Sequence, residues 1–505
     1  MFRFAILLFS VFAGILAEPL ESPKIVIVGA GASGIAAASR LLQNGYENLI
    51  LLEAEDRIGG RIYTTHIGDY KVDLGAQWVH GEKGNVAFDL AFPLGLLERP
   101  NLDIPYTKLY TGPGVALDQE VTNDLKKMYD TELDVASNFT DEVEGSVGEF
   151  LEQQIKEYFA KHPEINETLQ KELLWHYNLL QTGLDGSDTW YDVAAKSYSD
   201  YHDCEGNPIV NWKERGYSTI LDILMKKIPE PSEELPVLNK THLGTEVTKV
   251  DYTSDDGKVK IITEDGTEYI ADHVIMTPSL GVLKAEYETL FDPPLPESKI
   301  NSIKGIGFGA AGKIALLFND TWWNDALGEV DSFSFLWNEK DRMELEANDE
   351  KKWMLSVAAF IFIPYKPRML LAWISGEGAR FADAVPDELL LNQTMYMLNK
   401  YLSEDYNISE PITMRRSQWS TNKHFRGTYS FKGLETDNKN ASVEELSEPI
   451  IKAGKPIVLF AGEATNKYHF STVHGAIETG WREADRIMDY YNTNSKEKEG
   501  EATEN

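Results

Sequence analysis

The fold of this chain is decided by residues 24–61, which read KIVIVGAGASGIAAASRLLQNGYENLILLEAEDRIGGR. The apolar run at 25–28 is typical of a strand that is buried on both faces of a parallel sheet. Gly29, Gly31 and Gly34 follow with the spacing G-x-G-x-x-G. These glycines allow a tight turn, a close approach of the backbone to a pyrophosphate, and close packing of a helix on the strand. The Ala-rich run after them predicts that helix, whose free N–H groups and positive dipole end can bind phosphate.

The second half of the stretch supplies partners for a ribose and for the same phosphates. An apolar strand at 48–52 ends at Glu53, which lies 19 residues after Gly34. A carboxylate at this place can accept hydrogen bonds from ribose hydroxyls. A second glycine pair then allows another close backbone approach, and Arg61 supplies a fixed cation. This ordered set predicts a dinucleotide site rather than a plain βαβ turn.

The length and charge of the chain limit its function classes. With 505 residues, 42% of them hydrophobic, it can bury a large core and should form two domains or one interleaved pair. The net charge is −33, and acid-rich stretches occupy 118–152 and 341–352. This charge argues against a nucleic-acid partner and favours a cation, although most of these residues serve only solubility.

Both ends of the chain carry segments that are expected to lie outside the folded domains. Arg3 precedes an apolar run at 4–13, and small residues lead to Ala17. This layout is typical of a secretory signal peptide at 1–17, with an uncleaved membrane anchor as the alternative. The polar tail at 493–505 is expected to be disordered, and it carries neither an apolar anchor nor a peroxisomal or endoplasmic-reticulum retrieval signal.

Glycosylation acceptors agree with secretion to the extracellular space. The sequence N-x-S/T occurs at Asn138, Asn166, Asn239, Asn319, Asn392, Asn407 and Asn440, which is more often than chance would give. The single cysteine, Cys204, excludes an intrachain disulfide, which a chain of this size does not need. No metal site is predicted.

Two motifs in the first two thirds of the chain leave their roles open when they are read alone. Residues 72–81, VDLGAQWVHG, predict a strand that ends in a glycine-rich turn carrying Trp78 and His80. A lone histidine of this kind is more often structural than catalytic. Residues 303–318, IKGIGFGAAGKIALLF, predict a strand that contains Lys313. Because an ammonium among apolar residues is costly, the residues alone favour a lysine that snorkels to water.

The C-terminal region is expected to return to the dinucleotide site. Residues 456–465, PIVLFAGEAT, predict a buried strand that ends in Glu463, at the edge where ligands bind in open α/β sheets. The stretch STVHGA at 471–476 opens a predicted helix at 477–490. The N-terminal N–H groups of that helix can stabilise negative charge on a cofactor ring. The predicted cofactor domain is therefore discontinuous.

Five separated motifs resemble those of the flavin amine oxidase family, and within it the FAD-dependent polyamine oxidases of the spermine oxidase and N1-acetylpolyamine oxidase type. The motifs are E-A-x-x-R-x-G-G-R at 53–61, D-L-G-A-x-W-x-H-G at 73–81, A-W-x-x-G at 372–376, G-E-A-T at 462–465 and T-V-H-G-A at 472–476. The resemblance runs from Pro23 to Tyr490, which is nearly the whole predicted mature chain.

The resemblance implies an α/β fold. A discontinuous Rossmann-like FAD-binding domain is expected to be interleaved with an α+β substrate-binding domain that is built on a mixed sheet. The FAD domain is expected at 22–95, 208–292 and 415–492, and the substrate domain at 96–207 and 293–414. Helical patterns at 147–161 and 167–180 are expected to belong to a cap over the flavin.

The same resemblance assigns roles to individual residues. His80 is expected to face the substrate amine, and Lys313 to hold a water against flavin N5. Val247 matches a residue whose backbone contacts adenine, and Thr428 stands where relatives with a covalent flavin carry a cysteine. The predicted FAD contacts are Gly29, Gly31, Ser33, Gly34, Glu53, Ala54, Gly60, Arg61, Ala76, Gln77, Val247, Glu463, Thr472 and Val473. The predicted substrate contacts are Trp78, His80, Tyr429 and Thr472.

The activity that the resemblance implies is amine oxidation with non-covalent FAD. Hydride passes from the carbon beside an amine nitrogen to the flavin, and the imine hydrolyses to an aldehyde and an amine. O2 then reoxidises the flavin and gives H2O2, while the lack of a second dinucleotide fingerprint leaves no site for NAD. The expected partners are a small cationic amine and O2, with no stable membrane span after signal cleavage.

Two departures from the family pattern leave the amine open. Gln181 stands where several polyamine-oxidising relatives carry a carboxylate, with Asp185 and Asp188 nearby. Thr472 stands where some relatives place a second aromatic, so a cage with Tyr429 would be one-sided.

Three alternative functions follow from the same sequence. One is a secreted L-amino-acid oxidase, although no motif identifies an arginine for the substrate carboxylate. Another is a monoamine oxidase, which would carry a cysteine near Thr428 and a C-terminal membrane helix. The third is a non-catalytic flavin-binding secreted protein, and the presence of Lys313 and His80 argues against it.

Overall fold

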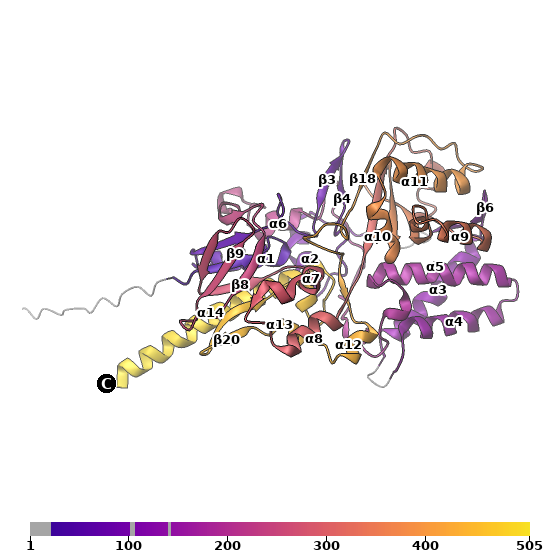
Figure 1. The fold of residues 1–505 in the computed structure, drawn as a ribbon. Helices are drawn as coiled ribbons and strands as arrows, with labels where there is room; N and C mark the ends of the chain where they lie inside the picture. Colours follow the sequence, from indigo (N-terminus) through magenta and orange to yellow (C-terminus); the bar gives the residue numbers. More distant parts are fainter. Residues whose placement is uncertain (1–21, 101–106, 140–142, 505) are drawn as a thin grey trace, which may run out of the picture.

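The computed structural model describes residues 22–100, 107–139 and 143–504 (Figure 1). The predicted signal peptide at 1–17 lies outside these residues. Two large sheets organise the described part, one with six strands and one with seven.

The six-stranded sheet is built on the opening apolar run. Its strands, in spatial order, are β20 (Ile450–Lys452), β21 (Lys455–Phe460), β11 (His273–Met276), β1 (Ile25–Val28), β2 (Leu49–Leu52) and β7 (Thr241–His242). β1 pairs in parallel with β2 on one side and with β11 on the other. β21 continues the parallel pairing beside β11. Strands from three distant parts of the chain therefore meet in one sheet.

Two helices from opposite ends of the chain cover this sheet together. α1 (Ala32–Gln43) follows the glycine turn and packs along α14 (Val473–Glu504). A Cβ on Gly34 would lie 2.0 Å from the carbonyl oxygen of Gly29, and a Cβ on Gly480 would lie 2.2 Å from that of Ser33. Both distances are too short for any side chain, so glycine at these two positions is what lets α1 pack closely against the turn and against α14.

Smaller elements complete the part of the molecule around this sheet. A four-stranded sheet has the order β10 (Glu268–Ala271), β9 (Val259–Thr263), β8 (Val247–Asp251) and β12 (Phe291–Asp292). Two further pairs are β3 (Thr64–Ile67) with β4 (Tyr70–Asp73), and β13 (Gly307–Phe308) with β19 (Ser430–Phe431). The helices are α2 (Val86–Ala91), α6 (Thr219–Leu224), α7 (Leu280–Leu290), α8 (Glu297–Gly305), α12 (Leu434–Asn438) and α13 (Val443–Ser447).

The seven-stranded sheet organises the rest of the described chain. Its order is β18 (Thr413–Arg416), β14 (Ala311–Leu317), β17 (Met369–Ser375), β16 (Val357–Phe362), β15 (Ser332–Phe335), β5 (Lys108–Gly112) and β6 (Val115–Ala116). Only the β15–β5 pair among these strands is parallel. The predicted α/β fold with a mixed second sheet is therefore confirmed.

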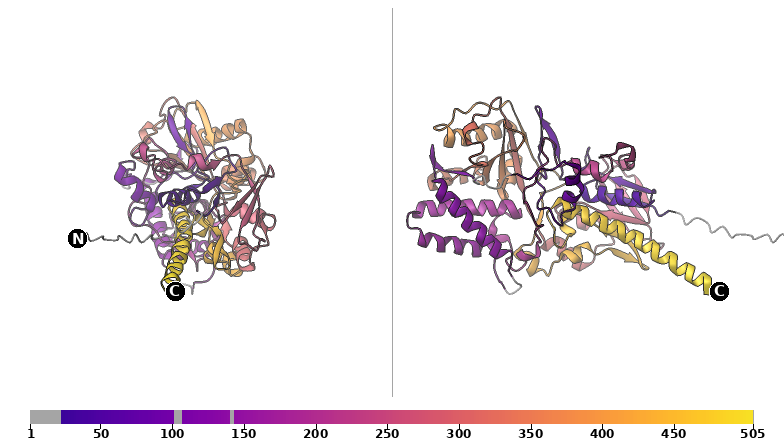
Figure 2. Two further views of the ribbon diagram at one scale, coloured as in Figure 1. Left: turned by 90° about the vertical axis from the view of Figure 1, so that its left-hand side faces the viewer. Right: turned by 180° about the vertical axis from the view of Figure 1, so that it is seen from behind.

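Helices surround the seven-stranded sheet. They are α3 (Gln119–Ala136), α4 (Val147–Lys161), α5 (Glu167–Asp185), α9 (Glu339–Glu346), α10 (Glu377–Ala384) and α11 (Asp387–Leu402). Figure 1 and Figure 2 show α3, α4 and α5 at one end of the molecule, while α1 and α14 lie towards the other. α4 has the bounds that the helical pattern at 147–161 predicts.

The polar tail belongs to helix α14 in the structure. Residues 493–504 were predicted to be disordered, but α14 continues through them and projects away from the rest of the structure (Figure 2). Lys, Glu and Ala are good helix formers, and extending a helix that is already nucleated avoids the nucleation cost. The expectation of disorder considered the tail apart from the helix that leads into it.

The expected domain boundary between 414 and 415 falls inside β18, at the edge of the seven-stranded sheet. Within the described ranges, no helix combines the length and the apolar character that crossing a bilayer requires.

Candidate active site

A cavity of about 1130 Å³ is lined by residues from both large sheets and from the loops between them. One part of its wall comprises the turn between β1 and α1, the end of β2 and the start of α14. Another part comprises β14, the end of α5 and the turn that carries His80. The predicted phosphate-binding and catalytic residues therefore share one cavity.

The two glycine motifs lie against each other at this cavity. An isolated parallel bridge joins Gly31 to Gly59, and a Cβ on Gly60 would lie 3.3 Å from the Cα of Gly31. Ser33 Oγ is buried at the same wall and has no hydrogen-bond partner within the described structure. An unpaired buried hydroxyl beside helix N–H groups fits a phosphate oxygen.

Glu53 is held in place by two backbone hydrogen bonds and can accept further ones. Its carboxylate accepts hydrogen bonds from the backbone N–H of Ala30 at 2.6 Å and of Glu55 at 2.9 Å. Burial raises the pKa of Glu53 above its ordinary value, while these two backbone bonds act in the opposite direction. Since a carboxylate has about four acceptor sites, Glu53 can also accept ribose hydroxyls.

Arg61 is oriented by an ion pair with the carboxylate of Glu463. Arg61 Nη1 donates to Glu463 Oε1 at 2.7 Å and to the Thr428 carbonyl oxygen at 2.6 Å. The other oxygen of Glu463 accepts from Ser430 Oγ at 2.6 Å and from the Ser471 N–H at 2.9 Å. The side chain of Glu463 thus positions Arg61 and two loops.

The N-terminus of α14 opens onto the cavity through Thr472 and Val473. Thr472 Oγ1 accepts the Gly475 N–H at 3.0 Å and donates to the His469 carbonyl oxygen at 2.7 Å, so it fixes the first turn. The positive end of a long helix therefore faces the space where the sequence places the flavin ring. Ala54, Gly60, Ala76, Gln77 and Val247 also line the cavity, whereas Gly34 serves helix packing.

Lys313 does not snorkel to the surface. It is 4% exposed, and its ammonium donates to the carbonyl oxygens of Asp73 and Gly75 at 3.1 and 2.7 Å and to Gln77 Oε1 at 2.7 Å. Burial lowers the pKa of Lys313 to about 7, although the charge of Asp73 acts in the opposite direction. The lysine thus lies in the cavity wall and changes charge near neutral pH.

His80 presents one defined ring nitrogen for substrate. Its Nδ1 lies 2.9 Å from the Pro208 carbonyl oxygen, which can only accept, so Nδ1 carries the proton and Nε2 keeps a lone pair. The side chain is exposed to the open cavity, yet the surrounding protein lowers its pKa by desolvation. Neutral His80 is therefore suited to accept a hydrogen bond from an amine.

Aromatic rings flank Lys313 and also line the part of the cavity wall that carries Tyr429. The rings of Trp78 and Trp373 lie 5.9 Å apart, and Lys313 Nζ lies 5.8 and 5.1 Å from their respective centroids. Tyr429 lines the cavity and donates its hydroxyl to the Gly183 carbonyl oxygen at 2.8 Å. Trp373 was noted in the sequence only as part of a motif, because its contact with Lys313 depends on the pairing of β14 with β17.

A carboxyl group that the site prediction missed lies at the end of α5. Asp185 lines the cavity and accepts a hydrogen bond from Gln181 Nε2 at 2.5 Å. Burial raises the pKa of Asp185 to about 7. Gln181 itself is buried and does not line the cavity, whereas Asp188 pairs with Arg380 outside it. In the sequence, Asp185 lies four residues after Gln181, which is about one helical turn. This spacing was the signal that could have identified Asp185.

Acidic residues outnumber lysine and arginine residues along the cavity wall. Eight Asp or Glu residues line it, against four Lys or Arg residues. Desolvation lowers the pKa of His80, and the charge of one of these acids, Asp203, acts in the opposite direction. The excess favours a cationic ligand.

Comparison with known proteins identifies the family. The family model described as flavin containing amine oxidoreductase matches residues 32–488. The chain is 29% identical over 496 residues to the peroxisomal N(1)-acetyl-spermine/spermidine oxidase of Bos taurus, covering 93% of this chain and 95% of that protein. It is 27% identical over 524 residues to polyamine oxidase 1 of Oryza sativa subsp. japonica, with 93% and 98% covered.

A solved structure of a putrescine oxidase double mutant shares the fold. It has a TM-score of 0.64 and 18% identity, covering 92% of this chain and 99% of that one. The family requires FAD. Three features of the cavity fit this cofactor, namely the unpaired Ser33 hydroxyl, the facing glycines and the N-terminus of α14. The chain therefore belongs to the flavin containing amine oxidoreductases, which makes it an FAD-dependent enzyme.

Proposed function

We propose that this enzyme oxidises a polyamine, meaning spermine, spermidine or an acetylated form, with O2 to an aldehyde, an amine and H2O2. The observation that carries this proposal is the presence of Lys313, His80 and Asp185 in one cavity that has an excess of carboxylates. The names of the bovine and rice relatives support the same substrate class.

The residues around the amine prepare it for oxidation. FAD, when bound, supplies the hydride acceptor. The reacting nitrogen must be neutral before its neighbouring carbon can give up hydride, and neutral His80 can accept a hydrogen bond from it through Nε2. Lys313, with its pKa of about 7, can hold a water and exchange a proton with it. The rings of Trp78 and Trp373 flank this lysine.

A second ammonium of the substrate finds a carboxyl partner in Asp185. Above pH 7 this group is mainly ionised, because its pKa is raised to about 7 and not beyond. Binding of a cation would favour the ionised form further. A monoamine cannot use this partner, so the cavity should discriminate by the number of positive charges.

The test is peroxide release from purified, flavin-loaded enzyme with polyamines, monoamines and amino acids. Polyamines should give the highest kcat/KM. Better oxidation of amino acids would favour an L-amino-acid oxidase, and better oxidation of monoamines a monoamine oxidase. No peroxide from any of these compounds would favour a flavin protein without catalysis.

Ionic strength should weaken polyamine binding. Screening shortens the reach of charge from about 30 Å at 0.01 M salt to about 8 Å at 0.15 M. The KM for spermine should therefore rise steeply over this range, whereas the KM for a monoamine should change little. A KM for spermine that does not change with salt concentration would show that the acidic residues serve solubility alone.

The flavin is expected to be held without a covalent bond. Thr428, which has no thiol, is buried where covalent relatives carry a cysteine, and the single cysteine, Cys204, lies elsewhere in the cavity wall. Acid precipitation should release all yellow colour into the supernatant. Flavin that stays with the pellet would contradict this prediction.

Secretion and glycosylation remain part of the proposal. Side chains of all seven acceptor asparagines are exposed in the structure, as glycan attachment requires. Protein from a eukaryotic secretory host should lose mass on treatment with an N-glycosidase. Unmodified protein that stays inside such cells would contradict both features.

A further inference from the structure

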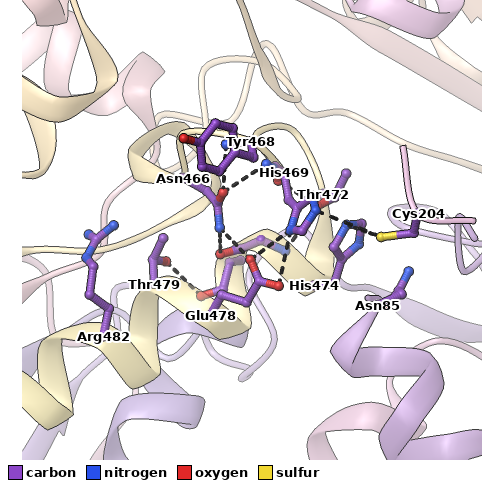
Figure 3. Close-up of polar contacts among 12 residues, drawn as sticks. Asn85, Cys204, Asn466, Tyr468, His469, Thr472, His474, Glu478, Thr479 and Arg482 are labelled. Atoms are coloured by element: carbon purple, nitrogen blue, oxygen red, sulfur yellow. Dashed lines mark hydrogen bonds and ion pairs between the residues drawn. The ribbon is translucent and has the colours of Figure 1, made fainter. Parts of the chain in front are cut away.

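One cluster of side chains outside the proposed amine chemistry has the composition of a metal site. Cys204, His469 and His474 each present one ligand atom, and these atoms lie within 4.8 Å of one another. Cys204 Sγ lies 3.9 Å from His469 Nε2 and 3.8 Å from His474 Nε2 (Figure 3). We propose that the three residues bind a zinc ion that clips the loop carrying Cys204 to the start of α14.

The three ligand atoms lie further apart than in an occupied zinc site, so they must close in around the ion. With Zn–S of about 2.3 Å and Zn–N of about 2.0 Å, tetrahedral ligand atoms lie roughly 3.3–3.6 Å apart. The two sulfur–nitrogen distances are a few tenths of an ångström longer than that. The two imidazole nitrogens lie up to 4.8 Å apart, so the imidazoles must move towards each other when the ion binds. One thiolate and two imidazoles are typical zinc ligands, and three protein ligands leave the fourth position for water.

A carboxylate already orients one of the imidazoles. Glu478 accepts from His469 Nδ1, with oxygens at 2.9 and 3.1 Å, and also from Asn466 Nδ2 at 2.7 Å (Figure 3). Because Nδ1 carries the proton in this bond, Nε2 keeps its lone pair and points at Cys204. A carboxylate behind a histidine is the usual outer-shell partner of a zinc ligand.

The backbone around the ligands is closely packed. A Cβ on Gly475 would lie 1.9 Å from the His469 carbonyl oxygen, so the His469 turn rests directly on the first turn of α14. A Cβ on Gly81 would lie 2.4 Å from Cys204 Cβ, so the cysteine rests on the residue after His80. His474 is 1% exposed. These contacts hold the ligand atoms near one another before any ion binds.

The binding step balances without a redox partner. Zn²⁺ replaces the thiol proton of Cys204, binds the neutral imidazoles and keeps one water, so one proton is released and no electron moves. The ion joins a segment of the predicted substrate domain to a helix of the cofactor domain. Its role is to hold the loop beside His80, and it takes no part in amine oxidation.

The experiment uses full-length, FAD-loaded enzyme made without a polyhistidine tag. After chelation and dialysis, added Zn²⁺ should bind at about one ion per chain and raise the Tm. Co²⁺ should bind with the same stoichiometry and show the d–d absorption of a tetrahedral thiolate site, at longer wavelength than the oxidised flavin absorbs. Absence of tight binding, or octahedral Co²⁺ spectra, would overturn the proposal.

Variants separate this site from other metal ligands on the chain. Cys204→Ser and His469→Gln should each lose the stoichiometric metal while keeping their FAD. His202→Gln is the matched control, since His202 stacks on Tyr468 beside the site and contributes no ligand. Glu478→Gln should weaken Zn²⁺ affinity by about 10- to 100-fold. Full metal content in FAD-loaded Cys204→Ser and His469→Gln, or its loss in His202→Gln, would place the ion elsewhere.

Discussion

Lys313→Met is expected to slow amine turnover by about 10- to 1000-fold, the range of a positioned acid–base group. The Lys313 ammonium has three oxygen acceptors at the cavity wall, and its pKa of about 7 lets it exchange a proton near neutral pH. FAD content should stay that of the wild type, because the glycine motifs and α14 lie in another part of the cavity. Peroxide release at saturating polyamine, per mole of bound flavin, measures the effect.

A second buried lysine provides the matched control. Lys299 is 2% exposed, donates to three backbone oxygens at 2.6–2.9 Å and has a pKa lowered to about 7 by burial, yet it does not line the cavity. Lys299→Met should lower the Tm about as much as Lys313→Met and leave turnover unchanged. Equal loss of turnover in both variants, or wild-type turnover in flavin-loaded Lys313→Met, would remove this lysine from the mechanism.

Asp185→Asn is expected to raise the KM for spermine by about 10- to 100-fold. A hydrogen bond to a charged group contributes about 1.5–3 kcal/mol, and the amide that replaces the carboxylate cannot form the ion pair with a second ammonium. The KM for a monoamine should not change, because that substrate has no charge to place at Asp185. The measurement compares KM values for both substrates above pH 7, where the wild-type group, with its pKa of about 7, is mainly ionised.

Asp188→Asn is the control for this prediction. Asp188 is three residues further along the chain but pairs with Arg380 and does not line the cavity. Its substitution should leave both KM values near those of the wild type. If Asp185→Asn raises the KM of monoamines as much as that of spermine, the group supports the shape of the site and does not bind a second charge.

The dinucleotide unit could be predicted from the sequence because its information is local. The apolar run at 25–28 forms β1, the glycines lead into α1, and Glu53 follows β2 with its carboxylate at the turn. Helix α4 has the predicted bounds for the same reason: its apolar spacing and its Ser146–Glu149 capping box lie within one short segment.

The environment of Lys313 could not be predicted from its neighbours in the sequence. Its neighbours in the chain are apolar, so the sequence read alone favoured a lysine that reaches the surface. In the structure its acceptors come from the segment 73–77, about 240 residues away, and burial in their company lowers its pKa. The family resemblance assigned this residue to the active site, and Lys313 lines the cavity. Its lowered pKa follows from the tertiary contacts.

Short-range patterns in the sequence predicted the strand–helix–strand dinucleotide unit and helix α4, and the family resemblance supplied the cofactor class and the candidate residues of the site. Only the tertiary structure brought Asp185 into the cavity and Cys204 against His469 and His474, which are 265 and 270 residues away. Such groupings depend on how packed elements place side chains within a few ångströms, and that placement has no signature in the spacing of residues along the chain.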